Sequence, residues 1–235
     1  MAMRIFLVLA LWAVPAAAQL PDASGKDTLS IWVVQGNDTL PMGRLIDSIT
    51  VQRNRGVPLV HRVLWTDAPI FGPRVDTVVS RLDTGALLRY VGVTPRGTDR
   101  VDVVNGRATG TASGPGGTSV VIDLSLPDST VLATNLDLVL RSRLLYVGDI
   151  VAVRLFVPPL LSIGVAEMRV EAEPLVDGER AWRLAAINLD NKVTYWISQR
   201  SRLLLRQTML GPNGALLLLD RRRIPTPQPR PLPRP

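Results

Sequence analysis

GVAEMRVEAE, residues 164–173, alternates small or apolar side chains with charged ones along its length. In an extended strand the apolar set lies on one face: Ala166, Met168, Val170 and Ala172. The charged set lies on the other face: Glu167, Arg169, Glu171 and Glu173. The stretch therefore predicts a β-strand with one buried and one solvated face.

Four other stretches are rich in the β-branched and aromatic residues typical of strands. They are VPLVHRVLW (57–65), TSVVIDLSL (118–126), DIVAVRLFV (149–157) and KVTYWIS (192–198). Turn signals suited to tight hairpins recur between strands: Gly36-Asn37-Asp38, Asn105-Gly106, Asp177-Gly178 and Asn213-Gly214. About a dozen short strands joined in this way predict an antiparallel meander, and no alternation of strands and helices indicates a parallel α/β sheet.

One segment, TNLDLVLRSRLL (residues 134–145), has helical periodicity instead. Its apolar stripe consists of Leu136, Val139, Leu140 and Leu144. Asn135 suits the N-cap position, and Asp137 and Arg141 are spaced for an i,i+4 ion pair. We predict a single helix of about ten residues packed on the sheet.

The N-terminus has the pattern of a secretory signal peptide. Arg4 supplies a positive charge, residues 5–14 form an apolar run, and Pro15 and three alanines follow. We expect cleavage after Ala18. The run is shorter than the ~20 residues of a membrane-spanning helix, and no cysteine follows for a lipid anchor. The expected product is a soluble exported protein, periplasmic or extracellular, with no transmembrane segment after signal removal.

Composition excludes several classes of function. The chain has no cysteine, so disulfides, thiol catalysis and cysteine metal sites are excluded. Its formal net charge is +7, but of 27 basic residues one lies in the signal peptide and five lie in the last fifteen positions. The remaining 21 face 20 acidic residues, so the folded part has no basic bias and nucleic-acid binding is not expected.

Residues 224–235, IPTPQPRPLPRP, place proline at every second position. Alternating proline prevents a regular helix or a central strand and favours an extended polyproline conformation. We therefore expect a single β-rich domain over residues 19–223 followed by a disordered Pro/Arg-rich tail. Two interpretations of the tail remain: a cationic arm that touches an anionic envelope surface, or a terminus without a role.

Asp83-Thr84-Gly85 matches the catalytic triplet of aspartic peptidases. Such enzymes need two carboxylates that share a proton, and no second Asp-Thr-Gly or Asp-Ser-Gly exists, which leaves only a homodimeric, retroviral type. GTASGPGG (110–117) and LLYVG (144–148) resemble the flap and a later element of that type. Arg81, however, stands where a buried apolar residue is usual, and the triplet also suits a turn between strands. We favour the turn and keep the peptidase as the alternative.

Other chemistry has little support in the sequence. His61 is the only histidine, and no Gly-x-Ser-x-Gly elbow exists for a serine nucleophile. Glu167 and Glu171 lie ~13 Å apart along a strand, too far to work as one pair. We therefore predict no catalytic residue, no metal site and no cofactor.

Several segments of the chain resemble a family of exported bacterial proteins of unknown function. They are DTVVSRLDTGALLRY (76–90), LDLVLRSRLLYVGD (136–149), MRVEAEPLVDGERAWRLAA (168–186) and TYWISQRSRLLLRQTMLGPNG (194–214). The likeness spans residues 28–220. That family is similar to lipoprotein-localisation carriers, whose antiparallel sheet curls into a half-barrel over a helix and holds acyl chains. The resemblance implies a strongly curved sheet with one short helix against its concave side, and it implies no catalytic residues.

A half-barrel leaves apolar residues that the helix does not cover, and these either line a cavity or pack solid. The hairpin AWRLAAINLDNKVTYWIS (181–198) is the candidate wall of such a cavity. The candidate ligand-binding residues are Trp182, Leu184 and Ala186 on its first strand and Val193, Tyr195 and Ile197 on its second. The favoured function is non-enzymatic: an envelope protein that binds an apolar or lipid-like ligand, or a protein partner.

Overall fold

A computed structural model describes residues 24–69, 72–113, 117–211 and 214–221. The expected signal peptide, the tail from residue 224 onward and Asn213 of one expected turn lie outside these residues. No helix in the described part of the chain is long and apolar enough to cross a bilayer.

The described residues form sixteen strands, more than the dozen expected. The strands are β1 (Gly25–Gln35), β2 (Asp38–Asn54), β3 (Val57–Asp67), β4 (Arg74–Arg81), β5 (Leu87–Thr94), β6 (Gly97–Val104), β7 (Arg107–Ser113), β8 (Ser119–Ser125), β9 (Val131–Leu132), β10 (Ile150–Val157), β11 (Ser162–Ala172), β12 (Leu175–Val176), β13 (Glu179–Ala186), β14 (Thr194–Ser198), β15 (Leu204–Leu210) and β16 (Leu216–Asp220). The helical elements are η2 (Ala133–Asn135), α1 (Leu136–Arg141) and η3 (Pro158–Leu160).

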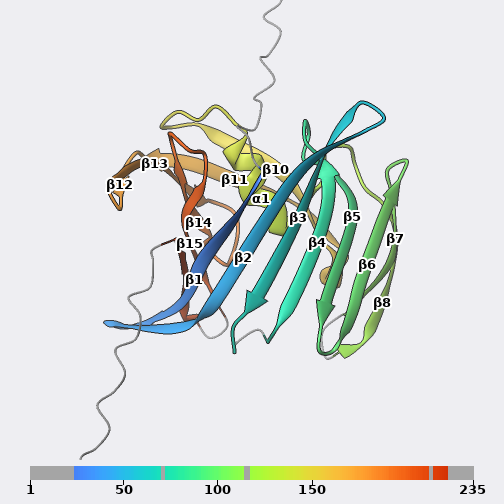
Figure 1. Cartoon of the computed structure of the whole chain (residues 1–235), viewed down its shortest axis with the longest axis horizontal. Coiled ribbons are helices and arrows are strands. Elements are labelled where there is room, and N and C mark those ends of the chain that lie inside the picture. Colours follow the sequence, from blue (N-terminus) through green and yellow to red (C-terminus); the bar gives the residue numbers. More distant parts are fainter. Residues whose placement is uncertain (1–23, 70–71, 114–116, 212–213, 222–235) are drawn as a thin grey trace, which may run out of the picture.

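The strands form one large sheet in the order β8-β7-β6-β5-β4-β3-β2-β1-β16-β15-β14-β13-β11-β10-β9, and β12 pairs with β13. Neighbours are antiparallel except for the short parallel pair β9–β10. In Figure 1 the blue-to-green strands β1–β8 form one side of a curved sheet, the yellow-to-red strands form the other, and α1 lies between them. The prediction of a strongly curved, antiparallel half-barrel with one short helix is confirmed.

The alternation in β11 is the predicted one. Ala166, Met168 and Val170 are fully buried, whereas Arg169 and Glu171 are exposed. The turns at residues 105–106 and 177–178 also have the predicted conformation, because both residues of each have positive φ.

Register shifts and a glycine bend the sheet. Pairing shifts by one residue at four places, in the pairs β1–β2, β4–β5, β11–β13 and β14–β15, and such bulges increase local twist. In β7, Gly110 has φ +147°, and a Cβ there would lie 1.9 Å from the carbonyl oxygen of Arg100 on β6. Only glycine permits this close approach of two backbones.

Two apolar clusters occupy much of the concave side of the sheet. One includes Leu140, Met168 and Leu184, and the other includes Val101 and Phe156. Strand β9 joins them, since its first residue packs in one cluster and its second in the other. The backbone N–H of Leu87, at the start of β5, donates to the carbonyl of Thr130 just before β9 (2.9 Å). The β9–β10 edge therefore lies against the inner face of the opposite wall, and the sheet is rolled onto itself.

The helix is shorter than predicted. It spans six residues after the three-residue turn η2, and Leu144, expected on its apolar stripe, is 62% exposed while Leu145 is buried. Ser142 ends it, because its hydroxyl donates to the carbonyl of Val139 (2.7 Å), a local bond that competes with helix continuation. Asn135 occupies the N-cap position but makes no side-chain cap bond, which corrects its expected role.

Candidate functional site

A cavity of about 490 Å³ lies on the concave side of the sheet, between the helical segment and the wall. Its walls are mostly apolar and come from strands at both ends of the described chain: Leu29 and Ile31 on β1, Leu45 on β2, Leu64 on β3, and Leu217 and Leu219 on β16. Cavities of roughly 300–1,000 Å³ with such linings are the usual sites for small ligands.

Strand register explains how distant residues meet in this wall. Tyr195 on β14 lies opposite Gln207 on β15, Gln207 lies opposite Leu219 on β16, and Leu219 lies opposite Ile31 on β1. Directly opposed residues share a face of an antiparallel sheet, so these four side chains form one row on the inner face.

A second row continues around the curve. Leu29 on β1 lies opposite Leu45 on β2, Leu45 lies opposite Thr66 on β3, and Thr66 lies opposite Arg74 on β4. This row becomes polar along its length, from two leucines to a threonine and an arginine. Arg74 is partly exposed, with 34% of its side chain accessible, so the polar end is the one that reaches solvent.

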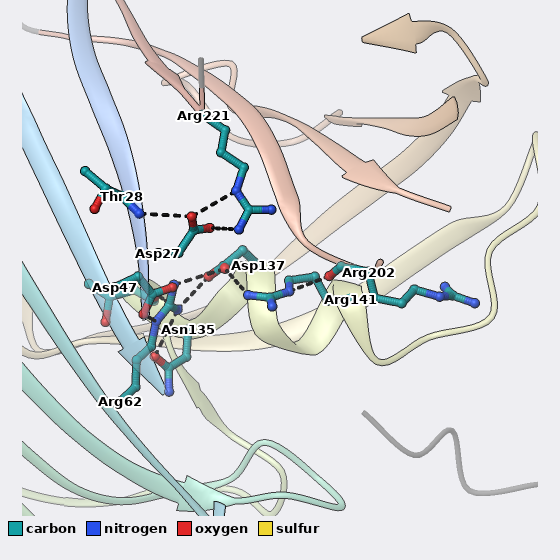
Figure 2. Close-up of polar contacts among 10 residues, drawn as sticks. Asp27, Thr28, Asp47, Arg62, Asn135, Asp137, Arg141, Arg202 and Arg221 are labelled. Carbon is teal, nitrogen blue, oxygen red and sulfur yellow. Dashed lines mark hydrogen bonds and ion pairs between the residues drawn. The ribbon is translucent and has the colours of Figure 1, made fainter. Parts of the chain in front are cut away.

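A buried polar cluster lies beside the cavity. Arg62 on β3 is 3% exposed and binds two carboxylates, one from β2 and one from α1. Its Nε and Nη2 lie 2.9 and 2.7 Å from the carboxylate oxygens of Asp47, and its Nη1 and Nη2 lie 2.7 and 3.0 Å from those of Asp137. Figure 2 shows these contacts together with that from Arg141 to Asp137, the predicted i,i+4 ion pair (3.7 Å).

All the hydrogen-bond donors of Arg62 have partners within the protein. An arginine has five N–H donors, and Arg62 gives four to the two carboxylates and the fifth to the carbonyl of Thr134 (2.9 Å). Burial by itself would lower the pKa of Arg62, but the charges of Asp137 and Asp47 outweigh burial and raise the pKa, so the guanidinium stays charged. Arg62 therefore has no donor left for a ligand, and its role is to tie α1 to the sheet.

A second polar group lines the cavity at Arg74. Its Nε donates to Asp76 (2.7 Å), its Nη2 donates to the hydroxyl of Tyr90 (2.7 Å), and that hydroxyl donates to Asp76 (2.8 Å). Gly92 lies opposite Asp76, and a Cβ there would meet the Tyr90 hydroxyl at 2.2 Å. The absent side chain makes room for the closed ring of three hydrogen bonds.

Tyr195 and Gln207 differ from these groups. Tyr195 is 6% exposed and Gln207 is half-buried, and both line the cavity. Within the residues that the structure describes, neither side chain makes a hydrogen bond. Burial, and then the negative charge of Asp137, raises the pKa of Tyr195, so its hydroxyl keeps its proton.

The six residues predicted to bind a ligand have different places. Val193 and Tyr195 line the cavity. Leu184 and Ile197 are fully buried in the first core cluster, against which Ala186 packs. Trp182 is 8% exposed in the same cluster, and the guanidinium of Arg202 lies 4.4 Å from its ring centre. The structure thus brings two of the six to the cavity and leaves four in the packed core.

Sequence reasoning missed most of the cavity wall. Those residues are the inward members of β1, β2, β3, β15 and β16, and each of these strands has apolar residues on both of its faces. Strands β1 and β16 lie at opposite ends of the described chain. Only their pairing brings these wall residues together, and local sequence patterns do not show that pairing.

Asp83-Thr84-Gly85 forms a turn between β4 and β5. Both carboxylate oxygens of Asp83 accept hydrogen bonds from the Arg81 guanidinium (3.0 and 2.7 Å), which lowers the pKa of Asp83. A catalytic dyad needs one carboxyl whose pKa is raised enough to hold the shared proton. Gly85 has φ +73°, and a Cβ there would lie 2.6 Å from Val139 of α1. The triplet serves the packing of a turn on the helix, and no observation supports the peptidase alternative.

Other polar groups and hollows of the described chain are weaker candidates for a functional site. In the described part of the chain no cluster of three or more His, Cys, Asp or Glu residues could hold a metal ion. His61 is half-buried on the face of β3 opposite to Arg62. A larger hollow of about 820 Å³ beside the β12–β13 turn is lined largely by polar and charged side chains, among them Glu179, Arg180 and Arg200. The apolar cavity is therefore the candidate site.

The fold and this interior cavity define a curled, barrel-like antiparallel β protein. No protein-family model and no curated protein matches the chain. Among solved structures, it is similar to the crystal structure of a β-barrel-like protein of the domain of unknown function DUF1849 from Brucella abortus. The two share 12% sequence identity with a TM-score of 0.50, over 83% of this chain and 94% of the other. At this identity the likeness shows the fold alone, and it agrees with the expected resemblance to a β-rich family of unknown function.

Proposed function

We propose that this protein is an exported, non-enzymatic envelope protein that binds an apolar or lipid-like molecule in the interior cavity. The observation that carries the proposal is the cavity itself: about 490 Å³, with apolar walls from several strands, and with its charged side chains paired to one another. Apolar walls supply binding free energy in proportion to the area they remove from water, and a few polar groups fix orientation.

The other parts of the proposal rest on sequence and on the polar groups. Residues 1–18 fit a secretory signal peptide, which supports export. The charged groups beside the cavity are bound to one another, Arg62 to Asp137 and Arg74 to Asp76, and such saturated pairs suit a structural role better than proton transfer.

Filling the cavity tests the function. The wild-type protein should bind a hydrophobic fluorescent dye or a fluorescent fatty acid saturably. Leu45 is half-buried and lines the cavity, so Leu45→Trp should weaken that binding by about tenfold or more, because the larger indole takes up cavity space that the ligand would occupy. Leu40→Trp is the matched control on the same strand, at a position 50% exposed, and should bind as the wild type does.

Two outcomes would contradict the proposal. One is the absence of saturable binding by the folded wild-type protein, as judged by its circular dichroism and thermal transition. The other is equal dye affinity for Leu45→Trp and Leu40→Trp, which would place the dye outside the cavity.

A further inference from the structure

Tyr195 and Gln207 form an unsatisfied polar pair inside the cavity. They lie directly opposite each other on β14 and β15, so their side chains are neighbours on the inner face. The charged liners Arg62, Asp137, Arg74 and Asp76 all have partners, whereas in the described chain these two side chains have no hydrogen bond.

The Tyr195 hydroxyl faces the cavity and has no partner among the described residues, but it is not fully enclosed, since the fully buried unpaired atoms of the described chain are Trp182 Nε1 and Gln199 Nε2. Most polar side chains in a protein interior are hydrogen-bonded, and one that faces a cavity takes its partner from water or from a ligand. A tyrosine hydroxyl is a donor and an acceptor, and a glutamine amide offers two donors and a carbonyl. Together they present donors from adjacent strands to the same side of the cavity, an arrangement that suits an acceptor atom of a ligand.

The surrounding charge selects the kind of acceptor. The cluster near Tyr195 contains two arginines, Arg62 and Arg141, and two aspartates, Asp47 and Asp137, so it offers no net positive charge to an anion. An anion buried without a counter-charge is strongly disfavoured. An uncharged carbonyl oxygen meets the donors without that cost.

We propose that Tyr195 and Gln207 form a subsite that hydrogen-bonds an uncharged carbonyl of the ligand, so that the cavity prefers acyl esters or amides to plain hydrocarbon chains and free fatty acids. This inference rests on the proposed function of the cavity. The acyl chain lies along the leucines of β1, β2 and β16, and the carbonyl lies at the β14–β15 wall.

Two matched ligands test the subsite. 1-Decanoylglycerol and 1-decylglycerol have the same chain and the same two hydroxyls, but only the ester has a carbonyl. In displacement of a hydrophobic dye from the full chain, the ester should bind about threefold to tenfold more tightly than the ether, the value of one hydrogen bond. Free decanoate should bind more weakly than the ester.

Three variants assign the preference to residues. Tyr195→Phe should bind ester and ether equally. Tyr146→Phe is the matched control, because Tyr146 is 67% exposed and outside the cavity lining, and it should keep the wild-type preference. Gln207→Met, at a half-buried position, should reduce the preference and serves as the second variant if Tyr195→Phe folds poorly.

The outcomes separate this inference from the function on which it rests. Equal ester and ether affinities in a wild-type protein that binds the dye would overturn the subsite and leave the cavity function standing. A preference that persists in both Tyr195→Phe and Gln207→Met would overturn it as well. No dye binding by the wild type would remove the proposed function itself.

Discussion

Arg62 carries a charge, although the residues on either side of it on the inner face of β3 are apolar and buried. Val60 and Leu64, two positions away on the same face of β3, are 3% and 6% exposed. A buried charge is tolerated when it is paired and fully hydrogen-bonded, and Asp47 and Asp137 supply that pairing from a strand and from the helix. The three residues therefore specify where the helix sits, even if the pairing adds little net stability over an apolar core.

Removing Arg62 should be costly because two buried carboxylates would be left facing each other. We expect Arg62→Met to lower the free energy of unfolding by about 3–5 kcal/mol, measured by urea denaturation followed by tryptophan fluorescence. Arg107→Met breaks the exposed pair with Asp123 and should leave the transition unchanged. Equal stabilities of the two variants would show that the cluster does not anchor the helix.

The cluster could not be predicted from the sequence. The Asp137–Arg141 pair was predictable because its spacing is local and helical. Arg62 and Asp137 are 75 positions apart, and both faces of β3 carry apolar residues, so alternation alone does not show which face is inward. Because arginine is usually exposed, a sequence-based prediction would place Arg62 on the outer face of β3, whereas it lies on the inner face.

The contact between α1 and the β4–β5 turn depends on a missing side chain. Gly85 and Gly178 both have positive φ, +73° and +83°, but a Cβ at Gly85 would lie 2.6 Å from Val139, whereas a Cβ at Gly178 would meet nothing within 4 Å. The two glycines share the backbone requirement and differ only in the helix that one of them touches.

Alanine at these glycines should separate backbone strain from packing. Gly178→Ala should cost about 1–2 kcal/mol, the penalty of a left-handed conformation. Gly85→Ala should cost that plus about 1–3 kcal/mol for overpacking, and Val139→Ala in the same chain should recover part of the excess. Chemical denaturation of the wild type and the three variants checks this. Equal losses at the two glycines would mean that the turn does not press on the helix.

Elements with strong periodicity were predicted well and their ends less well. The buried and exposed faces of β11 follow directly from alternation. The helix ends at Arg141 rather than near Leu144, because the Ser142 hydroxyl donates to the carbonyl of Val139. A serine in such a segment does not by itself predict a helix end. At the turn between β2 and β3, Arg55 takes positive φ beside Gly56, a turn missed since arginine is an unusual residue for it.

At the scale of the molecule, the rolled sheet creates the cavity. The pairing of β1 with β16 joins the two ends of the described chain, and the β9–β10 edge folds against the inner face of the opposite wall. A curved, helix-filled sheet was predictable through a resemblance, but the cavity position was not, because it depends on this long-range pairing. Of the six predicted binding residues, Val193 and Tyr195 reach it.

The last described residue, Arg221, is held by β1. Its guanidinium pairs with Asp27 (2.6 Å), and both side chains are partly buried, 27% and 23% exposed. This pair and strand β16 precede the Pro/Arg-rich segment, which has neither the alternation of a strand nor an apolar face. The body of the fold should therefore be complete without residues 224–235.

Truncation after Arg223 should leave the melting temperature within about 1 °C of the wild-type value, because no amphipathic element is removed. Arg221→Ala in the full chain is the comparison, and loss of its partly exposed pair should cost less than about 1 kcal/mol. Sedimentation with anionic and neutral vesicles completes the experiment. If the tail is an envelope-binding arm, truncation should reduce salt-sensitive sedimentation with anionic vesicles while dye binding in the cavity stays unchanged. A fall in melting temperature of several degrees on truncation would show instead that the tail docks on the body.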